Sequence, residues 1–151
     1  MNEAPTAQEI RITRVFDAPR ALVWQAWTDP EHLARWWGPR GRTTPVDSIT
    51  LELRPGGTFR VGSVSDEHGD DMVTTGTFRE VVEPERLVLE EAAEDSWHDG
   101  AVSEVRLIEL ADGRTEMRFR ATIHTTEEMI GIAETGINSG FDRLAEQVAA
   151  R

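Results

Sequence analysis

Residues 16–39 read FDAPRALVWQAWTDPEHLARWWGP and contain four of the five tryptophans in the chain. The stretch opens with a helix-start signal. The Asp17 side chain can accept hydrogen bonds from the free N–H groups of a first helical turn, and Pro19 loses no hydrogen bond there. Apolar side chains then recur at helical spacing. We therefore predict a short helix over residues 19–27 with one buried stripe.

A second short helix is predicted directly after the first. Asp29-Pro30 repeats the start signal and Gly38-Pro39 is a helix-end signal, so the helix should cover residues 31–37. One interpretation is that the tryptophans only pack the core and a lid. The alternative is that at least one of Trp36 and Trp37 lines the mouth of a cavity and contacts a ligand.

The flanking sequence alternates between apolar and polar residues, which is typical of strands with one buried face. Strands are predicted over residues 9–16, before the helices, and 46–54, after them, where Pro55-Gly56-Gly57 forces a turn. Five further runs of this kind cover residues 58–63, 73–82, 87–92, 102–110 and 114–123. Asp112-Gly113 separates the last two runs and favours a tight two-residue turn, so these strands should pair as a hairpin.

The last segment changes to helical periodicity, which predicts one long helix over residues 126–150. Gly131, Gly136 and Gly140 weaken this helix, or leave room for something bound beneath it. A curved sheet is not filled completely by one helix. The order strand, two short helices, strands and long helix therefore predicts an α+β fold with a cavity between the sheet and the last helix.

The composition indicates a single domain, which we place at residues 8–151 after a loose N-terminus of residues 1–7. No apolar run reaches the roughly 20 residues needed to cross a membrane, and no signal-peptide pattern is visible. We therefore expect a cytoplasmic protein without membrane insertion. The formal net charge of −12 repels phosphate backbones, which argues against nucleic acid as a partner.

The histidines give no catalytic or metal motif. The chain has no cysteine, its four histidines lack metal-ligand spacing, and neither a metal nor another cofactor is predicted. His32, His68 and His98 are expected to be solvated, with Trp97-His98-Asp99-Gly100 forming a turn. No catalytic residue is assigned. His124 is kept as a candidate because it lies where the last strand meets the long helix, within reach of a cavity.

Several motifs resemble one known family. They are RVFDAPRALVWQAWTDPEHLARWWGP (14–39), LRPGGTFRV (53–61), GTFREVVEPERLVLE (76–90) and GFDRLAEQV (140–148). Over nearly the whole chain the sequence resembles the AHSA-type proteins, homologues of the Hsp90 ATPase activator within the START-like or SRPBCC superfamily. The resemblance implies a helix-grip (START-like, Bet v 1-like) fold, in which a curved antiparallel sheet of six or seven strands wraps a long C-terminal helix around an apolar cavity.

The resemblance is less specific about function, because the superfamily includes lipid and sterol carriers, hormone receptors, polyketide aromatases and cyclases, and a co-chaperone domain. Our leading hypothesis is that the protein binds a small apolar or aromatic molecule between the sheet and the last helix, without catalysis. The expected lining residues are Trp36, Trp37, Phe59, Phe78, Met117, Phe119, Ile137 and Phe141. The alternatives are an aromatase-like or cyclase-like enzyme and a co-chaperone-like interaction module. A chaperone contact and a homodimer stay open as further partnerships.

Overall fold

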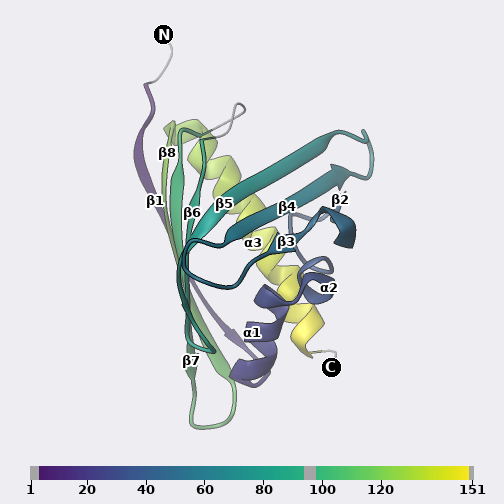
Figure 1. Cartoon of the computed structure of the whole chain (residues 1–151), viewed down its shortest axis with the longest axis vertical. Coiled ribbons are helices and arrows are strands. Elements are labelled where there is room, and N and C mark those ends of the chain that lie inside the picture. Colours follow the sequence, from purple (N-terminus) through teal and green to yellow (C-terminus); the bar gives the residue numbers. More distant parts are fainter. Residues whose placement is uncertain (1–3, 94–97, 150–151) are drawn as a thin grey trace.

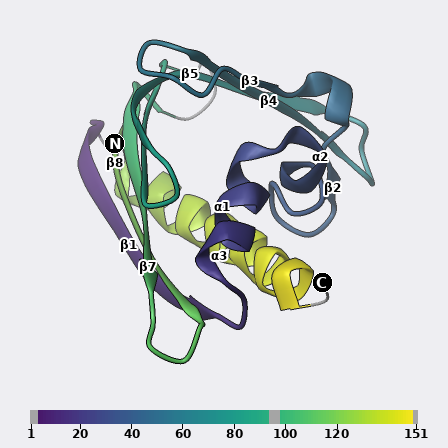
Figure 2. The same cartoon turned by 60° about the horizontal axis from the view of Figure 1, so that its bottom comes forward.

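The computed structural model describes residues 4–93 and 98–149. An eight-stranded antiparallel sheet curves around the long helix α3 (Glu127–Ala149), and two short helices, α1 (Arg20–Thr28) and α2 (Pro30–Leu33), follow the first strand (Figure 1, Figure 2). The strands are β1 (Thr6–Phe16), β2 (Arg42–Thr43), β3 (Thr50–Leu51), β4 (Thr58–Ser65), β5 (Asp71–Val82), β6 (Arg86–Glu91), β7 (Ala101–Glu109) and β8 (Thr115–Thr125). The helix-grip prediction is confirmed, and β2 is the one described strand that lies outside the predicted runs.

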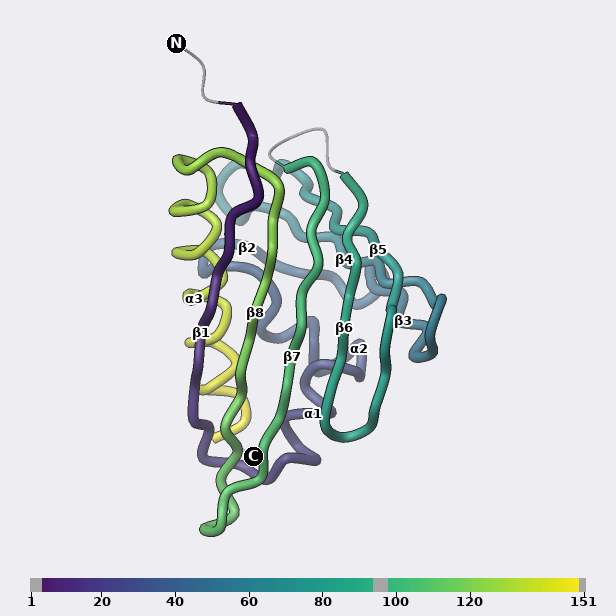
Figure 3. Tube along the Cα trace, turned by 90° about the vertical axis from the view of Figure 1, so that its left-hand side faces the viewer, coloured from purple at the N-terminus to yellow at the C-terminus, as the bar shows by residue number. Residues whose placement is uncertain are grey.

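The strand order is β1-β8-β7-β6-β5-β4-β2, with β3 also paired to β4 (Figure 3). The first and last strands pair along their full length, from Thr6 opposite Thr125 to Phe16 opposite Thr115. Strand β1 therefore begins inside the stretch of residues 1–7 that the sequence placed in a loose terminus. Its pairing with β8 brings α3, which follows β8 directly, back across the concave side of the sheet (Figure 2).

The predicted hairpin between the last two long strands is confirmed. Asp112 and Gly113 form the turn, where Gly113 has a φ of +87° and Arg114 N–H donates to Asp112 Oδ1 at 3.1 Å. In β8 every second side chain from Thr115 to Thr125 is buried, whereas the intervening ones face outward. The strand thus has one face for the core and one for solvent, as the alternation predicts.

The strand predicted over residues 46–54 is wrong for most of its length. A short 3₁₀ helix, η1 (Val46–Ser48), replaces its beginning, and only Thr50 and Leu51 join the sheet. The backbone then turns sharply, because Arg54 N–H donates to Glu52 O at 2.8 Å. At Gly57 a Cβ atom would lie 2.0 Å from Glu52 O, so this close approach requires glycine.

Of the two predicted helix-start signals, only the second is confirmed. Helix α1 starts without a side-chain cap from Asp17, because Pro19 itself occupies the N-cap position. The Asp29 side chain does cap α2, accepting from Glu31 N–H at 2.9 Å. Partial burial raises the pKa of Asp29, but hydrogen bonds from His32 and from the Glu31 backbone outweigh it and leave the pKa below its ordinary value. Helix α2 ends at Leu33, four residues earlier than predicted, and turns carry the chain onward.

Candidate functional site

The two short helices and the segment after them bring their tryptophans into one cluster against α3. Trp36 is 2% exposed, its ring centre lies 4.7 Å from that of Trp27, and its Nε1–H donates to Ala26 O at 2.9 Å. Phe141 of α3 contacts both rings, with centre-to-centre distances of 6.0 Å to Trp27 and 6.2 Å to Trp36. Edge-on and tilted contacts of this kind are favourable. Core packing therefore fixes this part of the cluster.

A second row of aromatic rings connects this cluster to the sheet. The Trp37 ring lies 5.8 Å from Trp36 and 5.6 Å from Phe59 of β4, centre to centre. Phe59 in turn meets Phe78 of β5 at 5.9 Å. Trp37 is half-buried rather than enclosed. The two adjacent tryptophans therefore differ in burial, since Trp36 is packed in the core and Trp37 keeps part of its surface exposed.

Between these rings, the sheet and α3 lies an apolar cavity of about 380 Å³. Its volume falls within the range of small-molecule sites. Seven of the eight residues predicted to contact a ligand line it: Trp36, Trp37, Phe59, Phe78, Phe119, Ile137 and Phe141. The eighth, Met117, is fully buried but lies outside the lining. It pairs with Leu107, one step along β8 beyond the cavity-lining pair of Phe119 and Val105. That these side chains bind a ligand stays a prediction.

Helix α3 contributes more of the cavity than the sequence analysis assigned to it. Besides Ile137 and Phe141, the helix lines the cavity with Met129, Ile132, Ala133, Gly136 and Gly140. These positions follow one helix face at spacings of three and four, so the helical periodicity of the sequence was enough to predict that they face the cavity. Gly136 and Gly140 lie in the wall, whereas Gly131 does not. The expectation that the glycines leave room beneath the helix therefore applies to Gly136 and Gly140.

The cavity reaches solvent between the beginning of β5 and the first half of α3. Met72 of β5 and Ile132 of α3 both line the cavity, yet they are 47% and 59% exposed. Large apolar side chains at such exposure border an opening rather than fill a core. We call this opening the mouth, defined by Met72 and Ile132.

The polar side chains of the lining are Thr74, Glu91, His98 and Ser103, and none of the described lining residues is lysine or arginine. The expectation that His98 is solvated is wrong, since it is 3% exposed. The loop around it is tied to β8, because Asp99 N–H donates to His124 O at 2.8 Å and His124 N–H donates to Gly100 O at 3.0 Å. This pairing draws His98 inward. Trp97, the first residue of the predicted turn, lies outside the described residues.

The catalytic candidate His124 lies on the outer face of the sheet. Strict alternation along β8 points its side chain away from the buried face, and that side chain is 51% exposed. Its Nδ1 lies 3.7 Å from Asp99 Oδ2. The structure therefore does not bring His124 to the cavity. Of the other histidines, His68 is exposed as expected and His32 is half-buried beside Asp29.

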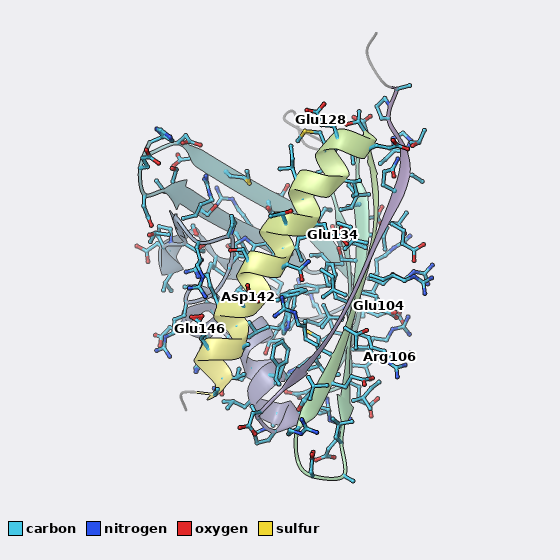
Figure 4. All side chains as sticks on the ribbon, turned by 180° about the vertical axis from the view of Figure 1, so that it is seen from behind. Glu104, Arg106, Glu128, Glu134, Asp142 and Glu146 are labelled. Carbon is cyan, nitrogen blue, oxygen red and sulfur yellow. The ribbon has the colours of Figure 1, made fainter. Side chains whose placement is uncertain are left out.

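A shift of the strand registers by one residue would turn Arg54, Glu90, Glu104 and Arg106 inward, but all four lie outside the cavity lining. Glu104 and Arg106 of β7 project from the side of the sheet opposite α3 (Figure 4). Glu104 Oε2 lies 2.7 Å from Arg86 Nε, in an ion pair on this outer surface. Arg54 and Glu90 are exposed. The observed registers therefore keep basic side chains away from the cavity.

Arg143 of α3 holds residues 35–39, the segment that contains Trp36 and Trp37, against the helix. Its guanidinium donates to the carbonyl oxygens of Gly38 at 2.9 Å, Arg35 at 3.1 Å and Trp37 at 3.2 Å, and to that of Pro39 at 3.4 Å. Burial lowers the pKa of Arg143, and the nearby charge of Arg40 acts in the same direction. The guanidinium stays charged at neutral pH because it loses its proton only in strong base. It therefore fixes the position of the segment that contains Trp37; we call this set of hydrogen bonds the clamp.

A second hollow lies between α1 and the turn that joins β5 to β6. Of its lining residues only Trp24 is buried, so the more deeply buried apolar cavity beneath α3 is the better candidate site. Within residues 4–93 and 98–149, no three acidic or histidine side chains gather as a metal-ligand set. In the same part of the chain, no helix combines the length and apolar character that crossing a membrane requires.

Comparisons with known proteins agree with this architecture. A family model described as Activator of Hsp90 ATPase homolog 1-like protein matches residues 17–149. A solved structure from Chromobacterium violaceum is 22% identical, with a TM-score of 0.79 over 93% of this chain and 96% of that one. A protein from Nitrosomonas europaea is 25% identical, with a TM-score of 0.75 and coverage of 91% and 92%. An AHSA1-like protein from Aeromonas hydrophila is 24% identical, with a TM-score of 0.78 and coverage of 95% and 96%. No curated protein matches the chain.

Proposed function

The chain belongs to the family of Activator of Hsp90 ATPase homolog 1-like proteins, and from this premise we propose that it binds one small neutral molecule, apolar or aromatic, in the cavity beneath α3. Membership of this family supports a ligand-binding or co-chaperone-like module. The observation that carries the proposal is the cavity itself, about 380 Å³ in volume and walled mainly by aromatic and aliphatic side chains. Burial of apolar ligand surface would drive binding, at roughly 25 cal/mol per Å² before the costs of association.

The charge of the wall supports a neutral ligand. None of the described lining residues is lysine or arginine, Glu91 is acidic, and the whole chain carries a formal charge of −12. A carboxylate or phosphate buried here would lose its hydration without gaining a fixed counter-ion, which is costly. Anionic lipids and nucleotides are therefore poor candidates. A deep cavity rather than a flat apolar patch also favours a small ligand over a chaperone surface, and a chaperone contact rests on the family alone.

The proposal predicts selective binding between two matched fluorophores. N-Phenyl-1-naphthylamine is neutral, and 8-anilino-1-naphthalenesulfonate is the same molecule with a sulfonate added. We expect the neutral probe to bind one per chain and to quench tryptophan emission, because Trp36 and Trp37 lie in the wall. The sulfonate should bind about tenfold more weakly or worse. Fluorescence titrations measure both; a lack of saturable neutral-probe binding, or tighter binding of the sulfonate, would refute the proposal.

A second candidate function is an enzyme resembling the aromatases and cyclases. Two titratable side chains, Glu91 and His98, lie in the lining, and acid–base chemistry needs at least such a pair. The distinction is experimental. A molecule that co-purifies with the protein and is recovered chemically unchanged after prolonged incubation favours a carrier. Conversion of that molecule, stopped by His98→Ala, favours an enzyme.

A further inference from the structure

Polar side chains enter the cavity floor at two of three successive rows across β6, β7 and β8. Cross-strand pairing places Leu87, Val105 and Phe119 in one row, and Leu89, Ser103 and Ala121 in the next. The row after that contains Glu91, Ala101 and Ile123. Successive rows on one face are two residues, or about 7 Å, apart. Across β6, β7 and β8 the floor therefore changes from a wholly apolar row to rows that contain Ser103 and Glu91, while Phe78 and Phe59 extend those two rows onto β5 and β4.

Ser103 is the polar group in the middle of this floor. It is 8% exposed, belongs to the buried face of β7 and lines the cavity. Its hydroxyl makes no hydrogen bond within residues 4–93 and 98–149. Its oxygen is not one of the fully enclosed polar atoms without a partner among the described residues, so it is open to the cavity, where a ligand group can form a hydrogen bond with it. A serine at this position is therefore a candidate contact for a ligand, flanked by apolar rows on which the rest of the ligand can pack.

We infer that the ligand is polarised: it places an aromatic or apolar body against Phe119 and Phe141 and a hydroxyl or carbonyl group on the hydroxyl of Ser103. This inference rests on the proposed function and adds the ligand's chemical class and its orientation. Phe119 and Phe141 are in mutual contact, with ring centres 5.2 Å apart, and form the apolar end. Glu91 and His98 lie on the far side of Ser103, where a hydrogen-bonding head group meets a polar wall.

The test compares two probes of equal shape, 2-naphthol and 2-methylnaphthalene, with the wild type and with Ser103→Ala. Both probes are neutral at pH 7, and they differ only in a hydroxyl in place of a methyl group. We expect the affinity ratio of naphthol to methylnaphthalene to fall about tenfold in Ser103→Ala, the size of one hydrogen bond. Phe119→Leu is the control. It removes apolar contact area, so it should weaken both probes and leave the ratio unchanged.

The outcomes separate this inference from the function it rests on. If both probes bind and the ratio is the same in the wild type and in Ser103→Ala, the Ser103 contact is refuted while ligand binding stands. If neither probe binds the wild type, the proposed function fails, and the inference fails with it. The melting temperature of Ser103→Ala supplies a further check. If the Ser103 hydroxyl is free to bind a ligand, the substitution leaves the melting temperature unchanged or raises it. A lower melting temperature would show that Ser103 makes a structural hydrogen bond, and would overturn the inference.

Discussion

Replacing Gly136 with leucine is expected to weaken binding of N-phenyl-1-naphthylamine about tenfold or more while the protein stays folded. Gly136 lies in the cavity wall, and a Cβ atom placed there meets no atom within 4 Å. The Cβ atom therefore enters open space, and the rest of a leucine side chain can extend from it into the cavity. Replacing a helical glycine also removes a cost of about 1 kcal/mol. We expect affinity to fall about tenfold or more and the melting temperature to stay equal or rise.

Gly131→Leu is the matched control for this substitution. Gly131 lies on the same helix, and a Cβ atom there also meets no atom within 4 Å, but the residue is exposed and does not line the cavity. The Gly131→Leu protein should gain the same helix stability as Gly136→Leu and bind N-phenyl-1-naphthylamine with wild-type affinity. Fluorescence titration and thermal unfolding of both variants decide the matter. Wild-type binding by a folded Gly136→Leu protein would mean that the probe binds elsewhere.

The second large effect is expected from Arg143→Met, which removes the clamp and keeps the apolar stem of the side chain. The carbonyl oxygens of Arg35, Trp37, Gly38 and Pro39 would lose their charged donor, and hydrogen bonds to charged groups contribute about 1.5–3 kcal/mol each. Because water can reach part of this segment, we expect a net loss of about 3 kcal/mol rather than the full sum. For a chain of this size that corresponds to a fall in melting temperature of about 6–12 °C.

The control for the clamp is Arg40→Met, in the same segment. Arg40 forms an exposed ion pair with Glu146, and exposed pairs contribute about 0–1 kcal/mol. Thermal unfolding, together with amide hydrogen exchange of residues 36–40, should show a large effect only for Arg143→Met. Equal stability of the two variants would show that the Arg143 hydrogen bonds do not hold the segment.

Periodicity and turn chemistry were sufficient to predict most of the fold. Alternation located the long strands, Asp112-Gly113 predicted the hairpin, and Asp29-Pro30 predicted the start of α2. Each of these signals depends only on residues close together in the chain, so it can be read directly from the sequence. The errors come where distant contacts override a local pattern. Residues 46–54 alternate like a strand, yet the close approach at Gly57 folds the chain out of the sheet after Leu51.

The candidate site was predictable only in its apolar part. Aromatic residues on the buried faces of strands and helices had to meet in the interior, which is why most of the expected lining residues do line the cavity. His98 and His124 were misplaced, because burial of a loop and the facing of a strand depend on pairing between β6, β7 and β8. The same register sets the limit of the cavity at Phe119, and so leaves Met117 outside it.

The measurement that tests ligand binding in the cavity most directly is nuclear Overhauser contact between bound N-phenyl-1-naphthylamine and assigned side chains. Ile137 lines the cavity, and Ile108 of β7 lies on the opposite face of the sheet. We expect contacts from the probe to Ile137 and Phe119 and none to Ile108. Contacts confined to Ile108 or other outer-face residues, with none to Ile137, would contradict a ligand site beneath α3.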